Sequence, residues 1–153
     1  MEKLTRIASF NVDHNTLERG VYVSRVDGDI TTYDMRFVKP NTPPFLPNAV
    51  MHTIEHLFAT YARNSAYADK VIYFGPMGCR TGFYFLLRDT DRAVALNLIK
   101  ELVQKCMSHQ GEIPGRSAIE CGNYLEMDFD GAVTTLKEYY NVISDKTVEN
   151  LNY

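Results

Sequence analysis

The sequence predicts an α+β fold: a single domain with one antiparallel β-sheet and helices packed on one face. Short runs rich in aromatic and β-branched residues come in consecutive pairs, as the two strands of a hairpin do. Segments with helical periodicity lie between and after these pairs and do not alternate regularly with single strands. The 153 residues are 45% hydrophobic, which is enough for one core, so we expect a single domain over residues 1–153.

The first strand pair is expected at residues 21–28 and 29–38, joined at Gly28. Polar and apolar residues alternate along both runs, which predicts one solvated face. The segment 9–15 before this pair shows no clean period. The segment 39–47 after it contains four prolines, which exclude a helix and favour an extended connection.

A helix is expected over residues 48–63, because this run contains neither Pro nor Gly and Asn48 can cap its first turn through the side chain. A second strand pair, residues 70–74 and 81–88, encloses a Gly/Pro-rich turn. A helix over residues 91–109, capped by Thr90, carries an apolar stripe at i, i+3/i+4 spacing.

The remainder of the chain predicts two further features. Ser117 and Glu120 match a capping box, although Gly122 would keep any helix there short. The last helix is expected from about residue 131 to 144, with Asp128 or Asp130 as its cap and a mobile tail after residue 145. Its buried face should carry Val133, Leu136, Tyr140 and Ile143.

Charge and composition narrow the class of partner. The formal net charge is −3 and Lys and Arg do not cluster, so the chain has no electrostatic footprint for nucleic acid or an anionic membrane. We find no signal-peptide pattern and no apolar run of about 20 residues, and we therefore expect a cytoplasmic protein. Three widely spaced cysteines do not form a disulfide framework. A small molecule or another protein is the expected partner.

The helix over residues 48–63 carries the main chemical signal. His52 and His56 lie one turn apart on one face, and Glu55 projects between them at its edge. Two neutral imidazoles at this spacing can bind Zn²⁺ or Fe²⁺, while the carboxylate transfers protons beside the metal. The order is the inverse of the H-E-x-x-H metallopeptidase motif. The alternative is a helix with two ordinary polar histidines, and a third ligand has to decide.

The cysteines supply candidates for that ligand and for catalysis. Cys106 lies on an apolar helical stripe, where a structural role is favoured. Cys121, before Gly122 in a loop, can complete a His₂Cys site that keeps its fourth position open. Cys79 stands on the turn beside Arg80, where positive charge and backbone N–H groups favour the thiolate, although a turn cysteine without a role is an equal alternative. A thiolate at Cys79 and Glu55 would form an acid/base pair across a bound substrate.

Together these motifs resemble the S-ribosylhomocysteine lyases, the LuxS family. The resemblance is carried by three motifs in order, with further matches at Ser9-Phe10, Asp13-His14 and the Arg36-Phe-x-x-Pro-Asn segment, so it covers nearly the whole chain. The three motifs are His-Thr-x-Glu-His-Leu from His52, Pro-Met-Gly-Cys-x-Thr-Gly from Pro76, and Cys121-Gly122. Tyr73 and Gly75 depart from the family, in which an acidic residue and a Ser are frequent before this turn.

The resemblance implies one divalent metal ion per subunit, natively Fe²⁺ with Zn²⁺ or Co²⁺ as substitutes. It implies a carbonyl migration followed by β-elimination, which converts S-ribosylhomocysteine to L-homocysteine and 4,5-dihydroxypentane-2,3-dione, the precursor of autoinducer-2. It further implies a homodimer with active sites at the subunit interface. The residues it assigns fall into three groups: the metal ligands His52, His56 and Cys121; the catalytic pair Cys79 and Glu55; and the substrate contacts Ser9, His14 and Arg36.

Two rival functions fit part of the pattern. An inverted-zincin metallopeptidase would use Glu55 to activate a metal-bound water and would not need Cys79. A structural metal domain would need a fourth ligand, for which the sequence offers only His14 and His109 as spare imidazoles.

Overall fold

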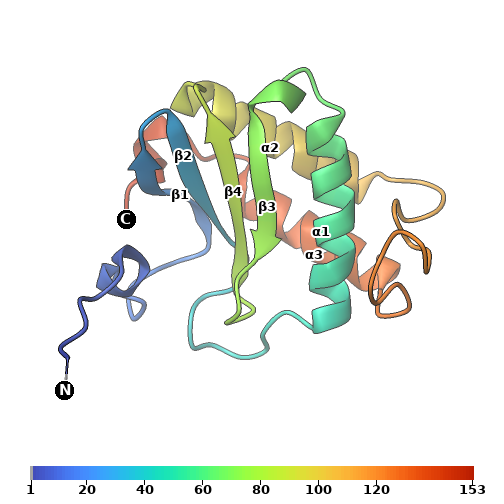
Figure 1. Cartoon of the computed structure of the whole chain (residues 1–153), viewed down its shortest axis with the longest axis horizontal. Coiled ribbons are helices and arrows are strands. Elements are labelled where there is room, and N and C mark those ends of the chain that lie inside the picture. The colour runs from blue at the N-terminus through green and yellow to red at the C-terminus, as the bar shows by residue number, and fades with distance from the viewer. Residues whose placement is uncertain (1) are drawn as a thin grey trace.

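In the computed structural model, which describes residues 2–153, four strands form one antiparallel sheet against which three α-helices pack (Figure 1). The strand order is β1-β2-β4-β3. The strands are β1 (Gly20–Asp27), β2 (Ile30–Arg36), β3 (Val71–Pro76) and β4 (Gly82–Arg88). The helices are α1 (Asn48–Arg63), α2 (Arg92–Met107) and α3 (Phe129–Ile143), with short 3-10 helices at Ala8–Asn11, Ala68–Lys70 and Val148–Leu151. The predicted α+β class is confirmed.

The core lies between the sheet and the helices. Figure 1 shows α2 and α3 behind the sheet and α1 beside β3. Alternate residues of the central strands point into this space and are fully buried, among them Tyr33, Met35, Phe83 and Phe85. The helices contribute Leu57, Ile99, Leu102 and Leu136. None of the helices in residues 2–153 is both long and apolar enough to cross a membrane.

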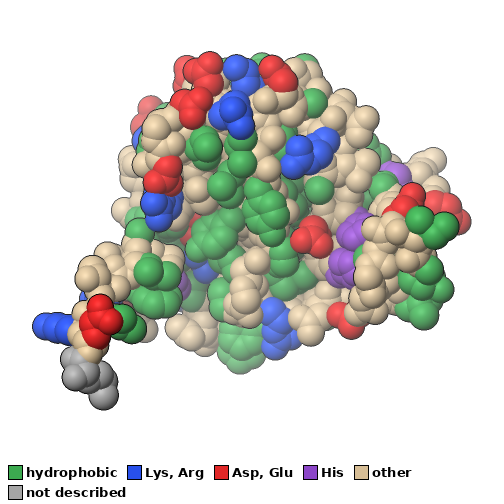
Figure 2. Space-filling model, in the orientation of Figure 1, with side chains coloured by type: hydrophobic (Ala, Val, Ile, Leu, Met, Phe, Trp, Pro, Cys, Tyr) green, Lys and Arg blue, Asp and Glu red, His purple; other side chains and the backbone are tan. Residues whose placement is uncertain are grey.

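The opposite face of the sheet is less exposed to solvent than the alternating sequence predicted. Asp34 and Arg36 point to this face, yet they are only 0% and 3% exposed. Tyr153 and the segment around His14 cover this end of the face, so the prediction of a fully solvated face is wrong here. Farther along, Tyr73 is 53% exposed beside its pairing partner Leu86. Figure 2 shows hydrophobic side chains gathered over the strands.

The N-caps of two of the three helices differ from the predictions. Helix α1 covers the expected residues, but Pro47 is its N-cap and Asn48 already lies inside the helix, so the predicted side-chain cap is wrong. Asp91, not Thr90, caps α2 by accepting a hydrogen bond from the Ala93 N–H at 3.1 Å. Asp128 caps α3 as expected, accepting from the Gly131 N–H at 2.9 Å.

Ser117 and Glu120 are hydrogen-bonded at 3.1 Å within a turn, and Gly122 was expected to keep any helix there short. Two other expectations for the C-terminal third are wrong. The tail is packed: Leu151 is 0% exposed, and Tyr153 hydrogen-bonds to Asp34. In α3, Tyr139 occupies the buried position predicted for Tyr140, because its hydroxyl reaches the Gly20 carbonyl of β1 at 2.9 Å.

Candidate active site

His52, His56 and Cys121 come together at the surface between α1 and the loop that joins α2 to α3. One ligand atom from each residue lies within 4.8 Å of the other two, and His52 Nε2 is 3.4 Å from Cys121 Sγ. All three side chains are half-buried. Figure 2 shows histidine side chains gathered at this junction. The structure thus brings together the three predicted ligands.

Backbone carbonyls fix the orientation of both imidazole rings. His52 Nδ1 lies 2.9 Å from the Glu126 carbonyl, and His56 Nδ1 lies 2.8 Å from the Pro114 carbonyl. A carbonyl only accepts, so each Nδ1 carries the proton and each Nε2 keeps its lone pair for a metal ion. Gly115 makes the second contact possible: its φ is +75°, and a Cβ there would lie only 3.0 Å from His56 Nδ1.

The group therefore fits a divalent ion of borderline softness. Two imidazole nitrogens and one thiolate sulfur are ligands that Zn²⁺ and Fe²⁺ both accept, and three ligands leave room for substrate. A cavity of about 360 Å³ adjoins it, lined by His52, Glu55 and Arg80 among others. His109 is not a spare ligand, because its Nδ1 accepts from the Tyr61 hydroxyl at 2.7 Å and its Nε2 donates to the Glu112 carbonyl at 2.8 Å. This pair of bonds ties the ligand-bearing loop to α1.

Glu55 lies where the sequence predicted, on the edge of the histidine face. Its half-buried side chain lines the cavity next to His52 and also a second cavity of about 350 Å³ next to His56. Tyr73 lines this second cavity as well. The Glu55 carboxylate can therefore reach a group that is bound next to His52 or next to His56.

Cys79 faces a different cavity from Glu55 within one chain. Met77, Gly78 and Arg80 of the turn line the cavity of the metal ligands. Cys79 and Thr81, from the same stretch, line a cavity of about 300 Å³ on the other side, together with His14 and Arg36. The exposed Cys79 thiol and the metal ligand His52 therefore line different cavities of the chain.

The cavity that Cys79 lines, which we call the thiol pocket, contains two of the three predicted substrate contacts. His14 and Arg36 line it, whereas Ser9 lines a neighbouring cavity of about 200 Å³ with Arg25 and Tyr84. His14 Nδ1 bonds to the Val12 carbonyl at 2.8 Å, which directs the ring. The single chain therefore brings Cys79, His14 and Arg36 together and leaves Ser9 apart.

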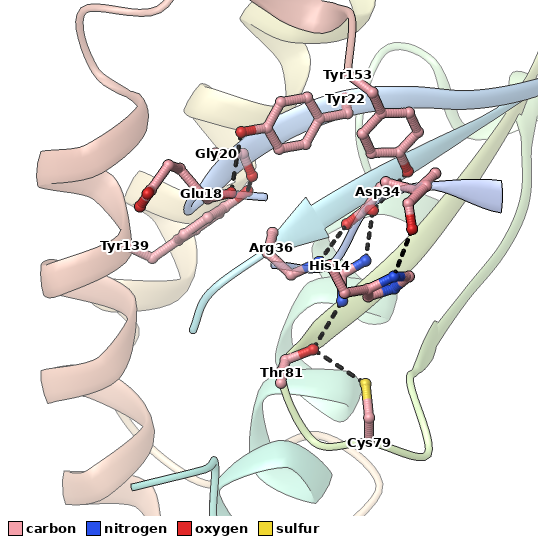
Figure 3. Close-up of polar contacts among 11 residues, drawn as sticks. His14, Glu18, Gly20, Tyr22, Asp34, Arg36, Cys79, Thr81, Tyr139 and Tyr153 are labelled. Carbon is pink, nitrogen blue, oxygen red and sulfur yellow. Dashed lines mark hydrogen bonds and ion pairs between the residues drawn. The ribbon is translucent and has the colours of Figure 1, made fainter. Parts of the chain in front are cut away.

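Sequence reasoning missed the partners of Arg36. Asp34 accepts from Arg36 through both carboxylate oxygens, at 3.1 and 2.6 Å, and Arg36 also donates to Thr81 (Figure 3). Burial alone would lower the pKa of Arg36, but the hydrogen bonds and charge of Asp34 raise it overall. The spacing i, i+2 on one strand was the available signal, because such residues share a face.

The fold and the site define a class of small α+β domains that can hold one metal ion through two histidines and a cysteine. The comparisons with known proteins make this assignment specific. The profile described as "S-Ribosylhomocysteinase (LuxS)" matches residues 7–150. The chain belongs to this S-ribosylhomocysteinase (LuxS) family.

Curated relatives match over almost their whole length. A protein of Clostridium acetobutylicum named S-ribosylhomocysteine lyase is 46% identical, over 98% of this chain and 99% of the relative. Proteins of the same name from Desulfotalea psychrophila and Borreliella burgdorferi are 45% and 40% identical, with the same coverage.

Proposed function

We propose that residues 1–153 form a single S-ribosylhomocysteine lyase domain. The reaction moves a carbonyl from C1 to C3 of the ribosyl group and then eliminates L-homocysteine. The second product is 4,5-dihydroxypentane-2,3-dione, the precursor of autoinducer-2. The family assignment supports the activity, and the convergence of His52, His56 and Cys121 is the observation that carries the mechanism.

The proposed cofactor is one divalent metal ion per subunit, held by His52, His56 and Cys121. Fe²⁺ is proposed as the native ion, with Zn²⁺ or Co²⁺ as substitutes, because all three accept mixed nitrogen and sulfur ligands. When bound, the ion supplies Lewis acidity that stabilises negative charge on the substrate oxygens during carbonyl migration. Thiols at Cys79 and Cys121 suit a reducing compartment, which supports the proposed cytoplasmic location.

The proton transfers are assigned to two side chains. Moving the carbonyl from C1 to C2 removes a proton from C2 and adds one to C1, and the second shift repeats this one carbon farther along. We assign the transfers at carbon to Cys79 Sγ and those at oxygen to the Glu55 carboxylate. Glu55 also serves the elimination, in which the C4 proton and the homocysteine sulfur leave. Ser9, His14 and Arg36 are assigned to substrate contacts, and Tyr73 shapes the space beside Glu55.

The proposed active site needs two copies of the chain. Cys79 and Glu55 line different cavities of one chain, and the two cavities share no lining residue. In a homodimer, the thiol pocket of one subunit can face the metal ligands of the other. The exposed apolar groups support such contact: Phe10 is 62% and Tyr73 is 53% exposed.

The deciding experiment is the release of free thiol from S-ribosylhomocysteine by metal-loaded protein. Wild-type protein should release homocysteine stoichiometrically, and Cys79→Ala should lose nearly all turnover while keeping its metal. A metallopeptidase would keep its activity in Cys79→Ala and would not act on this substrate. Cys106→Ala serves as the matched control, because that thiol is buried in α2 and should not affect turnover of the folded protein.

A further inference from the structure

A continuous chain of hydrogen bonds leads from the end of the sequence to Cys79 (Figure 3). The Tyr153 hydroxyl donates to Asp34 Oδ2 at 2.6 Å, and Arg36 Nη2 donates to the same oxygen at 2.6 Å. Arg36 Nη1 donates to Thr81 Oγ1 at 2.8 Å. Thr81 Oγ1 lies 3.0 Å from Cys79 Sγ. Four side chains thus form a series of hydrogen bonds that ends at the Cys79 sulfur.

The direction of the hydrogens follows from the groups themselves. The Asp34 carboxylate only accepts, and the Arg36 guanidinium only donates. Burial, and then the charge of Asp34, raises the pKa of Tyr153, so that hydroxyl stays protonated and donates. The Thr81 oxygen therefore receives an N–H from Arg36, and its own hydrogen is free for the sulfur. A thiolate can only accept, so the thiolate form of Cys79 completes the chain.

The middle of this chain of hydrogen bonds is removed from water. Asp34, Arg36 and Thr81 are 0%, 3% and 2% exposed. At one end the Tyr153 ring stacks on Tyr22, with centroids 5.0 Å apart and planes 18° from parallel. Gly82 brings β2 and β4 together at this point, since a Cβ there would lie 2.2 Å from the Met35 carbonyl oxygen. Buried hydrogen bonds to a charge are stronger than exposed ones.

We propose that Thr81 and Tyr153 are positioning residues for the reaction: together with the Asp34–Arg36 pair, they hold a hydrogen-bond donor on Cys79 and favour its thiolate. Thr81 acts directly on the sulfur. Tyr153 acts at a distance, by fixing the carboxylate that orients Arg36. The proposal rests on the catalytic role proposed above for Cys79.

Other charged or titratable groups of the same polypeptide chain lie near the Cys79 thiol, and the test has to leave them unchanged. His14 and Arg36 line the same cavity. The Tyr84 phenol lies close enough for Cys79 to contribute to the rise in its pKa, after burial and Asp34. The neighbouring Arg80 is directed elsewhere, since its Nη1 donates to the Leu46 carbonyl at 3.4 Å.

The test measures how fast iodoacetamide alkylates Cys79 as a function of pH, with the modified peptide quantified by mass spectrometry. Only the thiolate reacts, so the midpoint of the profile reports thiolate formation without any need for turnover. In Thr81→Val the midpoint should rise by about one to two pH units, the range expected for loss of a hydrogen bond to a charged group. Thr81→Ser keeps the hydroxyl and should restore the wild-type midpoint.

A second pair of variants probes the far end of the chain. Tyr153→Phe removes only the hydroxyl and should raise the midpoint by a smaller amount than Thr81→Val does. Tyr22→Phe is the matched control. The Tyr22 hydroxyl donates to the Glu18 carbonyl at 2.9 Å and takes no part in the hydrogen bonds that lead to Cys79, and the variant keeps the ring that stacks on Tyr153. It should leave the midpoint unchanged.

Two results would overturn the proposal: a wild-type midpoint in Thr81→Val, or equal shifts in Tyr153→Phe and Tyr22→Phe. If Thr81→Val does not fold, the two tyrosine variants decide by the second criterion. Thiol release from S-ribosylhomocysteine, measured on the same preparations, separates this proposal from the proposed function. The wild-type protein could show no lyase activity while the variants still shift the alkylation midpoint as expected. That result would refute the proposed function and leave the proposed role of the hydrogen bonds to Cys79 standing.

Discussion

Two inactive variants should restore each other's activity when they share a dimer. His56→Ala removes a proposed metal ligand, and Cys79→Ala removes the thiol on the other side of the turn. If each active site takes its metal ligands from one subunit and its thiol from the partner, a mixed dimer has one site with both defects and one with none. Random pairing of equal amounts gives about half mixed dimers, so activity should return to about a quarter of wild type.

The experiment uses co-expressed chains with different affinity tags and measures thiol release after the mixed dimers are verified by mass. The matched control combines His56→Ala with Glu55→Gln. Both changes lie on α1, so every site of that mixed dimer keeps a defect and activity should not return. Verified mixed dimers of His56→Ala and Cys79→Ala that remain as inactive as their parents would refute the two-chain site.

Three further predictions concern individual groups. Glu55→Gln should keep its metal and slow turnover by roughly 10²–10⁴-fold, the range for a proton-transfer residue, and near-normal rates with full metal content would contradict that role. Cys121→Ser should lose most bound metal in elemental analysis, whereas full stoichiometry would remove Cys121 from the site. Asp34→Ala leaves the Arg36 charge buried and unpaired, so denaturant unfolding should show a loss of roughly 3–5 kcal/mol, and a loss below 1 kcal/mol would show that water reaches the guanidinium.

The sequence predicted the elements well where a local signal specified them. The strand pairs and α1 follow from residue type and periodicity, and the spacing of His52 and His56 follows from helix geometry alone. The errors at Asn48 and Thr90 are errors of one residue in the cap: α1 begins directly after Pro47, and Asp91 accepts the bond expected of its neighbour Thr90. Local pattern is a good guide to such elements because their hydrogen bonds are local.

The burial of Asp34 and the order of the tail could not be predicted in this way. Alternation assigns Asp34 to the solvated face, and the packing of Tyr153 and of the segment around His14 reverses this. A polar tail residue looks mobile in a local window because the window does not contain its partner. Such contacts depend on chain topology, which periodicity does not report.

The turn over residues 76–81 shows why the motifs alone left the site incomplete. In one sequence motif, Gly78 and Arg80 line the cavity of the metal ligands, whereas Cys79 and Thr81 line the cavity that contains Arg36. Adjacency in a motif therefore does not imply one shared cavity. The two-subunit site proposed above would bring the Cys79 thiol of one chain to the metal ligands of the other. We expect the hydrogen bonds that run from Tyr153 through Asp34, Arg36 and Thr81 to set the reactivity of Cys79.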